Sequence, residues 1–367
     1  MATTTIDTPV EGLEIHAYRI PTDSPEADGT YAWESTTVVI VQAYGGEKVG
    51  LGYTYGSRAV GELIRDQLAD AVIGRDAMAV TACWDAMVRS IRNQGRPGQC
   101  SMAIAAVDTA LWDLKARLLD VPLVTLLGQV REGVAVYGSG GFTSYPPERL
   151  CEQLNGWVEA GIRRVKMKVG AHPEADPERV RLAADAIGPG ADLFVDANGA
   201  YSRKQALALA ECFAGRGVSW FEEPVSSDDL EGLRLIRDRG PAGMDIAAGE
   251  YGYDAFYFRH MLEAGAVDVL QADATRCGGI TGFLRAADLA WAFDIPLSGH
   301  TAPALHLHIG CAAPRIRHCE YFHDHVRIEE MLFEGVVKPV QGVLHPDLSR
   351  PGMGLELKRG EAERFAL

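Results

Sequence analysis

Residues that can bind a metal ion or move a proton recur between positions 166 and 320 at nearly constant spacing. Each one closes a short apolar run, and neighbouring members lie roughly 20 to 28 positions apart. In chain order they are Lys166 and Lys168, Asp196, Glu222, Glu250, Asp273, His300 and Glu320. This spacing is about that of one strand plus one helix, so the set is expected to converge if the strands are parallel neighbours.

Three carboxylates in this series, Asp196, Glu222 and Glu250, follow successive apolar runs and are expected to meet at one point. Three carboxylates at one point repel one another strongly unless a cation neutralises them. Oxygen ligands without Cys or His select Mg²⁺, for which Mn²⁺ can substitute. The sequence therefore predicts a Mg²⁺ site with open positions for water and for a substrate carboxylate.

Candidate acids and bases flank the predicted metal site. Lys166 and Lys168 are separated by one residue and point to the same face of a strand, where two ammonium groups near a metal ion lower a lysine pKa. Asp273 is placed to orient His300 and to raise its basicity. Glu320 is expected to be a buried carboxylic acid with a raised pKa that donates a hydrogen bond to a developing enolate oxygen.

This arrangement suits the removal of a proton from the carbon next to a carboxylate. The product of that step is an enolate dianion, so the metal ion and the acidic donor must stabilise charge as it forms. A cation flanked by two bases meets this requirement.

The elements that must position these residues begin near residue 134. Apolar runs alternate there with helix-length segments: VAVYG, RRVKMK, DLFVDA, VSWFEE, MDIAAGE, VDVLQAD, IPLSGH and HCEYF. Eight such runs predict an α/β barrel, a modified TIM barrel of (β/α)7β type, over residues 131–335. The C-terminal ends of barrel strands share one face, where active sites are built.

The first 130 residues have a different pattern. Strand-like segments at 13–20 and 36–43 and a turn at 45–47 come before helical patterns near 58–73, 78–92 and 101–118. Strands followed by helices predict an α+β domain over residues 1–130. The tail from 336 to 367 has no further strand–helix unit and is expected to pack back on this domain.

Composition excludes several classes of partner. The chain has 367 residues, 50 acidic against 35 basic, and a formal net charge of −15, which argues against nucleic acid or an anionic membrane surface. The seven cysteines form no CxxC pair, and reduced thiols in a cytoplasmic protein are expected. Neither a secretory signal nor an apolar run long enough to span a bilayer is recognisable.

The motifs also resemble a known family. VKMKVG, VDANGAY, FEEP, AAGE, DATRCGG, SGH and CEY, in this order, are similar to the mandelate racemase subgroup of the enolase superfamily, and the first domain resembles the capping domain of that family. The muconate-lactonising subgroup instead has a lysine on the sixth strand, and Asp273 followed by His300 argues against it. The resemblance implies a small-molecule carboxylate substrate and a homo-oligomer.

The resemblance also implies roles for single residues. It assigns Mg²⁺ to Asp196, Glu222 and Glu250. It makes Lys168 one base, with Lys166 beside it contacting the substrate carboxylate. His300 with Asp273 becomes the opposite base or acid, and Glu320 the electrophilic donor. Asn198 matches a family position that can contact the substrate 2-hydroxyl.

Substrate contacts are also expected from the capping domain, whose loops close over the pocket in this family. The corresponding segments here are 21–30 and 53–58, and both are rich in polar residues, which suits a hydroxylated substrate. Tyr53 and Tyr55 in the second segment are candidate substrate contacts. Ser139, in the GSGG stretch at 138–141, is another.

Three functions remain open at this point. The first is a sugar-acid dehydratase, in which Lys168 takes the C2 proton and His300 protonates the departing 3-hydroxyl to give a 2-keto-3-deoxy acid. The second is a racemase or epimerase that uses the same two bases without a leaving group. The third is a non-catalytic sugar-acid binding protein, against which the intact set of polar residues argues.

Other histidines and cysteines are expected to have no catalytic role. His306, His308 and the HDH stretch at 323–325 lack the ligand spacing of a zinc site and are interpreted as structural or surface residues. Cys277, beside two glycines, is interpreted as a residue chosen for backbone fit.

Overall fold

The N-terminal part of the molecule is an antiparallel sheet covered by helices. The computed structural model describes residues 8–367, so the start of the predicted capping domain, residues 1–7, lies outside the described residues. The sheet has the order β1 (Gly12–Ala27), β2 (Ala32–Gly45) and β3 (Lys48–Tyr55). The helices on it are α1 (Arg58–Leu63), α2 (Ala69–Val72), α3 (Val80–Ser90) and α4 (Gln99–Leu118), with a π-helical turn, Ile64–Leu68, between α1 and α2.

Strand β2 is buried on both faces because its β-branched residues alternate between two cores. Val39 and Val41 pack with the capping helices, whereas Val38 and Ile40 belong to the core shared with the barrel. Helix α4 lies directly against β3, where a Cβ atom on Gly52 would lie 2.1 Å from the carbonyl oxygen of Ala106. Only glycine permits this close approach.

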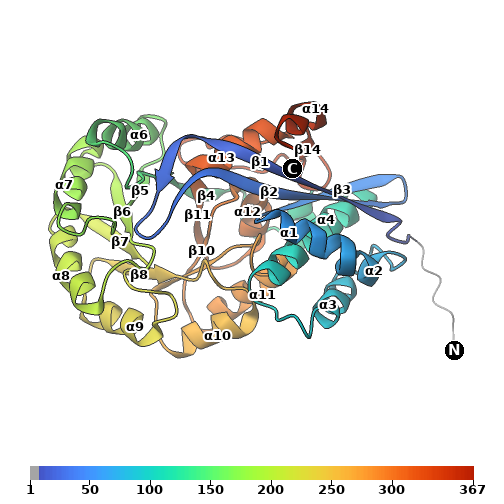
Figure 1. The fold of residues 1–367 in the computed structure, drawn as a ribbon, viewed down its shortest axis with the longest axis horizontal. Helices are drawn as coiled ribbons and strands as arrows, with labels where there is room; N and C mark the ends of the chain where they lie inside the picture. Colours follow the sequence, from blue (N-terminus) through green and yellow to red (C-terminus); the bar gives the residue numbers. More distant parts are fainter. Residues whose placement is uncertain (1–7) are drawn as a thin grey trace.

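A closed parallel barrel forms the rest of the molecule (Figure 1). Its strands are β4 (Val134–Gly140), β5 (Arg164–Lys168), β6 (Asp192–Asp196), β7 (Val218–Glu222), β8 (Asp245–Ala248), β9 (Val269–Ala272), β10 (Leu297–Gly299) and β11 (Ile316–Phe322). The intervening helices are α6 (Pro147–Glu159), α7 (Asp176–Ile187), α8 (Arg203–Ala214), α9 (Leu230–Arg239), α10 (Ala255–Glu263), α11 (Gly279–Ala292) and α12 (Pro303–Ala312). Strand β11 pairs with β4 and closes the barrel, which confirms the predicted fold class.

The register of the barrel strands explains why distant residues converge. Lys168 pairs with Asp196 across β5 and β6, and Asp196 pairs with Glu222 across β6 and β7. Beneath these strand ends, Tyr137, Phe194 and Trp220 fill the barrel interior. The polar residues therefore have packed aromatic rings on one side and the capping domain on the other.

The C-terminal segment packs against both parts of the molecule. Its elements are α13 (His323–Leu332), β12 (Phe333–Glu334), β13 (Val343–Leu344), β14 (Glu356–Leu357), α14 (Arg359–Ala362) and a 3-10 turn, Glu363–Phe365. Strand β13 pairs with the start of β4. The amide of Met353 donates to Asp113 of α4 over 2.6 Å, and the amide of Leu367 donates to the carbonyl of Ala17 in β1 over 3.0 Å. The predicted domain boundaries themselves stay predictions.

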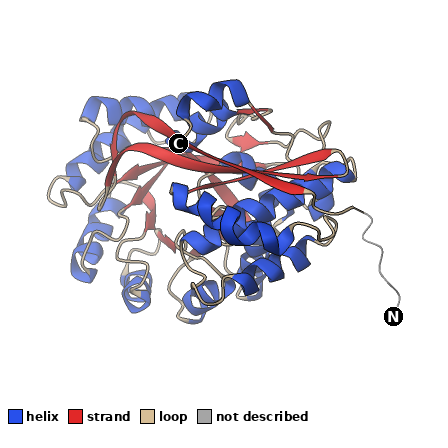
Figure 2. Cartoon of the chain, turned by 45° about the vertical axis from the view of Figure 1, so that its right-hand side comes forward, coloured by secondary structure: helices blue, strands red, loops and turns tan. Residues whose placement is uncertain are grey.

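The segment 21–30 is a strand and a tight turn, where we expected a polar loop. Strand β1 continues to Ala27 with an irregular register between Pro21 and Glu26. The hairpin turns at Asp28, whose Oδ1 accepts hydrogen bonds from the amides of Thr30 over 2.6 Å and Tyr31 over 2.7 Å. Figure 2 shows the long hairpin extending over the barrel, where the amide of Thr143 donates to the carbonyl of Ala27.

Within residues 8–367, no helix combines the length and the apolar character required to cross a bilayer.

Candidate active site

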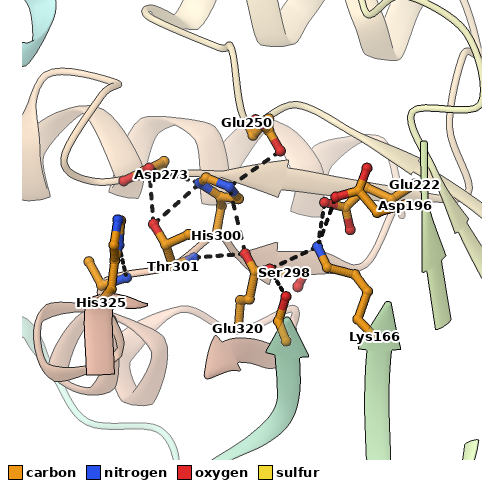
Figure 3. Close-up of polar contacts among 12 residues, drawn as sticks. Lys166, Asp196, Glu222, Glu250, Asp273, Ser298, His300, Thr301, Glu320 and His325 are labelled. Atoms are coloured by element: carbon orange, nitrogen blue, oxygen red, sulfur yellow. Dashed lines mark hydrogen bonds and ion pairs between the residues drawn. The ribbon is translucent and has the colours of Figure 1, made fainter. Parts of the chain in front are cut away.

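The strand ends of the barrel bring together the whole series of polar residues predicted from the sequence. Each of them is at most 6% exposed. Figure 3 shows Lys166, Asp196 and Glu222 on one side of the cluster and His300 with Asp273 on the other, with Glu320 below. The members are Lys166, Lys168, Asp196, Glu222, Glu250, Asp273, His300 and Glu320.

The three predicted metal ligands lie within reach of a single ion. One oxygen from each of Asp196, Glu222 and Glu250 lies within 4.8 Å of the others, and all three side chains are buried. Burial, and then the Asp196 carboxylate, raise the pKa of Glu222 to about 8. Oε2 of Glu250 has no hydrogen-bond partner among the described residues. An all-carboxylate set that is buried and mutually repulsive fits a hard divalent cation such as Mg²⁺.

The two lysines of β5 contact this carboxylate set. Lys166 Nζ lies 2.5 Å from Oε1 of Glu222 and 2.8 Å from Oε1 of Glu320, and Lys168 donates to Oδ2 of Asp196. Burial alone would lower the pKa of Lys166, but Glu222 and Glu320 outweigh burial and raise that pKa well above its ordinary value. From the sequence we expected a lowered lysine pKa, but that expectation applies to a site in which a metal ion offsets the carboxylate charges. It therefore stays a prediction.

His300 is held by a carboxylate on one side and faces the metal-ligand set on the other. Its Nδ1 donates to Oδ2 of Asp273 over 2.9 Å, and Nε2 lies 3.3 Å from Oε2 of Glu250. Thr275 fixes the other oxygen of Asp273 through two hydrogen bonds of 2.7 Å. Burial would lower the pKa of His300, but Glu250 and Glu320 raise it to about 10, so the imidazole is protonated in this arrangement.

Glu320 differs from the expected neutral acid. Burial raises its pKa, as the sequence analysis supposed, but Lys166, His300 and Lys168 lower that pKa to about 2. The ionised carboxylate accepts hydrogen bonds from the hydroxyl of Ser139 over 2.5 Å and from the amide of Thr301 over 3.1 Å. Glu320 therefore pairs with neighbouring cations in this arrangement, and its role as a donor to the substrate stays a prediction.

Ser139 and Tyr53 do not line the pocket as the sequence analysis expected. Ser139 is fully buried on β4, and its hydroxyl is committed to Glu320. The Tyr53 hydroxyl donates to Oε1 of Glu329 over 2.6 Å, and its ring packs on Phe333. Tyr53 lies on the same face of β3 as Tyr55 but is two residues farther from the strand end, which places it over α13 and away from the pocket.

A cavity of about 500 Å³ lies between the strand ends and the capping hairpin. Its barrel side includes Lys168, Asn198, Glu250, Tyr251, Arg276, His300, Thr301, Glu320, Phe322 and His325. Its opposite side consists of Asp28, Thr30, Tyr31, Trp33, Ser35, Thr36, Thr37, Tyr55, Gly56 and Ser57, which we call the lid wall. Asn198 and Tyr55 thus lie where a substrate contact requires them.

His325 is a pocket residue that the sequence analysis treated as structural or surface. Its ring stacks on Tyr55 with centroids 3.4 Å apart, and Nδ1 accepts a hydrogen bond from the amide of Ala302 over 3.4 Å. Burial lowers its pKa to about 3, so the ring is neutral and Nε2 carries the proton. The available signal was its position five residues after Glu320, at the same end of the barrel.

Arg276 is a second pocket residue that was missed, although it lies in the DATRCGG motif. Its guanidinium donates to Oε1 and to the backbone carbonyl of Glu250, each over 3.2 Å. By contrast, His306 and His308 are structural as predicted. His306 Nε2 accepts from the amide of Ala274 over 3.0 Å, and His308 Nε2 donates to the carbonyl of Met353 over 3.1 Å.

Comparison with known proteins identifies the family. Residues 149–362 match the enolase C-terminal domain-like family, and residues 18–128 match the N-terminal domain of mandelate racemase and muconate lactonizing enzymes. The chain belongs to the mandelate racemase subgroup of the enolase superfamily.

Several relatives of this chain are named as enzymes that act on sugar acids. A mandelate racemase/muconate lactonizing enzyme-like protein from Rubrobacter xylanophilus has a solved structure that is 56% identical, covers 98% of this chain and 100% of its own, and has a TM-score of 0.96. A 3,6-anhydro-alpha-L-galactonate cycloisomerase from Streptomyces coelicolor is 32% identical over 98% of this chain and 99% of its own length.

Dehydratases form the other group of relatives. The L-talarate/galactarate dehydratase of Salmonella typhimurium, solved with Mg and L-lyxarohydroxamate, is 27% identical, covers 100% of this chain and 95% of its own, and has a TM-score of 0.90. Magnesium in a structure so similar supports the Mg²⁺ assignment.

Proposed function

We propose that this protein is a Mg²⁺-dependent sugar-acid dehydratase, which removes the proton α to a carboxylate and expels the 3-hydroxyl to give a 2-keto-3-deoxy acid. The observation that carries the proposal is the placement of Lys168 and His300. Both line one cavity, and they contact different members of the same carboxylate set, Asp196 and Glu250. A substrate bound at that set would have one group for its α-proton and another for its leaving oxygen.

Asp196, Glu222 and Glu250 would hold the metal ion. When bound, Mg²⁺ supplies electrostatic stabilisation to the carboxylate of the substrate as negative charge develops on it. We propose that Mn²⁺ can replace it, because the ligands are all hard oxygen donors.

Lys168 acts as the base in this proposal. It takes the C2 proton, and the electrons of the C–H bond enter the enolate system. Lys166 is fully buried between Glu222 and Glu320, behind the residues that line the cavity, and in this proposal it contacts the substrate carboxylate. In this arrangement Asp196 outweighs burial and the neighbouring Lys166 and raises the pKa of Lys168, so the base role requires a cation at the carboxylate set to offset the charge of Asp196.

His300 acts as the acid. The C3–O bond breaks as Nε2 delivers its proton to the departing oxygen, so water leaves and an enol remains, which tautomerises to the 2-keto acid. Asp273 supports this step because its carboxylate accepts the hydrogen bond from Nδ1 of His300. The proton on Nε2 is then the one that can be transferred.

Cycloisomerisation is a second candidate, favoured by two relatives that are named as cycloisomerases. They align over 98% of this chain with 32% and 26% identity. In a 3,6-anhydro sugar acid the oxygen on C3 belongs to a ring, so the same elimination opens the ring and releases no water. A racemase or epimerase would use the same two residues without any leaving group.

Proton NMR in D₂O tests these possibilities, with Mg²⁺-loaded protein and a panel of aldonic acids, aldaric acids and their anhydro or lactone forms. A 2-keto-3-deoxy product that has lost the mass of one water supports the dehydratase. The same product without loss of mass supports the cycloisomerase. Exchange of the C2 proton without a new product favours the racemase or epimerase, and binding without exchange favours a non-catalytic sugar-acid binding protein.

A further inference from the structure

The two sides of the cavity differ in charge. The lysine and arginine that line it, Lys168 and Arg276, both belong to the barrel side, where each contacts a carboxylate of the catalytic cluster. The lid wall contains no lysine or arginine, and its charged member is Asp28. The end of a substrate that is distant from the reacting carboxylate therefore faces a surface without a cation.

Two hydroxyl groups on the lid wall, those of Thr30 and Thr36, have already committed their protons to protein oxygens, whereas the Tyr55 hydroxyl has no hydrogen-bond partner among the described residues and can donate to a substrate oxygen. The Thr30 hydroxyl donates to Oδ1 of Asp28 over 3.2 Å, and the Thr36 hydroxyl donates to Oδ2 of Asp324. A hydroxyl in this state presents lone pairs to the cavity. Lone pairs accept hydrogen bonds from substrate hydroxyls and repel a carboxylate.

Acidic residues also lie directly behind the lid wall. Asp324 is fully buried, and its second oxygen is paired with Arg327, whose guanidinium also donates to the carbonyl of Pro21. Glu26 is buried behind Trp33 and accepts the indole N–H over 2.8 Å, but burial raises the pKa of its carboxyl to about 8, so it adds little negative charge at neutral pH. Arg327 is thus already paired with Asp324, although its Nε has no hydrogen-bond partner among the described residues. A substrate carboxylate brought to this wall would be desolvated beside the Asp324 carboxylate.

Neutral groups beside the lid wall suit a polyol. His325 is uncharged and presents its Nε2 proton as a donor, which can bind a hydroxyl or ring oxygen. Tyr31 and Trp33 stack with centroids 6.0 Å apart and offer ring faces against which the C–H groups of a sugar can pack.

We infer that this pocket selects monocarboxylic sugar acids, aldonates or their anhydro forms, and discriminates against dicarboxylic aldarates. The inference rests on the proposed function, since the reacting carboxylate is taken to lie at the metal-ligand set. It adds that the far end of the substrate is neutral, because the lid wall accepts hydrogen bonds and has a negative charge of its own.

Pairs of substrates that differ only at C6 test this inference: gluconate and glucarate, galactonate and galactarate, mannonate and mannarate. The Mg²⁺-loaded, full-length protein is assayed for kcat/KM and for C2-proton exchange with each. We expect the monoacid to be favoured at least about tenfold in every pair that reacts. A diacid that reacts equally well or better overturns the inference and leaves the proposed function intact, whereas no reaction or exchange with any member overturns both.

Two variants locate the discrimination on the lid wall. Asp28→Asn keeps an oxygen for the turn but removes the charge, and should narrow the preference for the monoacid about threefold. Ser57→Lys places a cation on the lid wall at an exposed position whose hydroxyl makes no helix-capping hydrogen bond, and should narrow it at least as much.

Glu34→Gln is the matched control. Glu34 is exposed on the same hairpin but does not line the cavity, so this variant removes a nearby charge and should leave the preference unchanged. If Glu34→Gln alters the preference as much as Asp28→Asn does, or if neither lid-wall variant alters it, the assignment to the lid wall is wrong.

Discussion

The barrel side and the lid wall of one cavity are built on different physical principles. On the barrel side, charged groups lie at strand ends whose register fixes their separation, and they are almost fully buried and paired with one another. The lid wall has half-buried or exposed hydroxyl and aromatic groups on a hairpin and the turn after β3. The comparison suggests that the barrel determines which bond is broken and the hairpin determines which molecule is accepted.

The largest expected effect follows from changing a metal ligand on the barrel side. Glu222→Gln replaces a carboxylate with an amide of the same shape, so we expect turnover to fall about a thousandfold or more while the protein stays folded. We would measure Mg²⁺ binding by isothermal titration calorimetry, turnover by a kinetic assay, and folding by thermal melting followed by circular dichroism. Asp192→Asn, at the opposite end of the β6 strand, is the control. Full activity of Glu222→Gln would contradict the metal assignment.

Removal of the proposed acid, His300, is expected to have the next largest effect on turnover. His300→Asn should slow product formation by about 10² to 10⁴, because the leaving oxygen loses its proton donor. If Lys168 is the base for C2, this variant still exchanges the α-proton with D₂O, which proton NMR detects. Loss of exchange by the same factor as product formation would mean that His300 is required for enolisation as well.

His325, which adjoins the lid wall, should make the folded protein sensitive to acid. Its pKa is about 3 in the folded chain, whereas an unfolded histidine titrates near 6.5, so between these values the unfolded state binds a proton that the folded state excludes. The stability from this group is complete above pH ~6.5 and decreases as pH falls, by about 2 kcal/mol at pH 5. His325→Phe keeps an aromatic ring beside Tyr55 and should lack this component.

Urea titrations of the wild type and His325→Phe at pH 7.5 and pH 5 measure that difference. Other buried histidines contribute equally to both proteins and cancel in the comparison. Identical losses of unfolding free energy in the two proteins would contradict the neutral state of His325, and with it the neutral hydrogen-bond donor that we place beside the lid wall.

The smallest effect is expected at Tyr53, just beyond the lid wall. Tyr53→Phe removes the hydrogen bond to buried Glu329 and should lower the unfolding free energy by about 1 to 2 kcal/mol, with KM unchanged. Tyr55→Phe, two residues along the same strand face, is the comparison, because Tyr55 lines the cavity. If KM rises in Tyr53→Phe but not in Tyr55→Phe, the assignment of Tyr55 to the lid wall and of Tyr53 to the region beyond it is wrong.

The sequence predicted the barrel and the convergence of its polar residues because both depend on repeating patterns. Apolar runs that each end in a chemically active residue define a strand end, and adjacent parallel strands bring such ends together. Asp196 and Glu222 illustrate this, since they are paired neighbours in the structure.

What the sequence did not predict depends on distances between side chains. The pKa of Glu320 depends on three cations that surround it, so burial alone gave the wrong direction. Ser139 could face the pocket or Glu320, and the hydrogen bond of 2.5 Å from its hydroxyl to Oε1 of Glu320 is a contact that the pattern of apolar runs does not specify. His325 belongs to a helix that begins at the strand end, and its orientation depends on stacking with Tyr55 from a separate domain.

The contact between the last residues and strand β1 has a consequence for solubility. Strand β1 is an edge of the capping sheet, and Tyr18 forms a bridge with Ala366 while Leu367 donates to the carbonyl of Ala17. These residues cover part of an edge that would otherwise offer unpaired N–H and C=O groups to a strand from another molecule. A few residues far from any catalytic group thus protect the capping sheet against edge-to-edge aggregation.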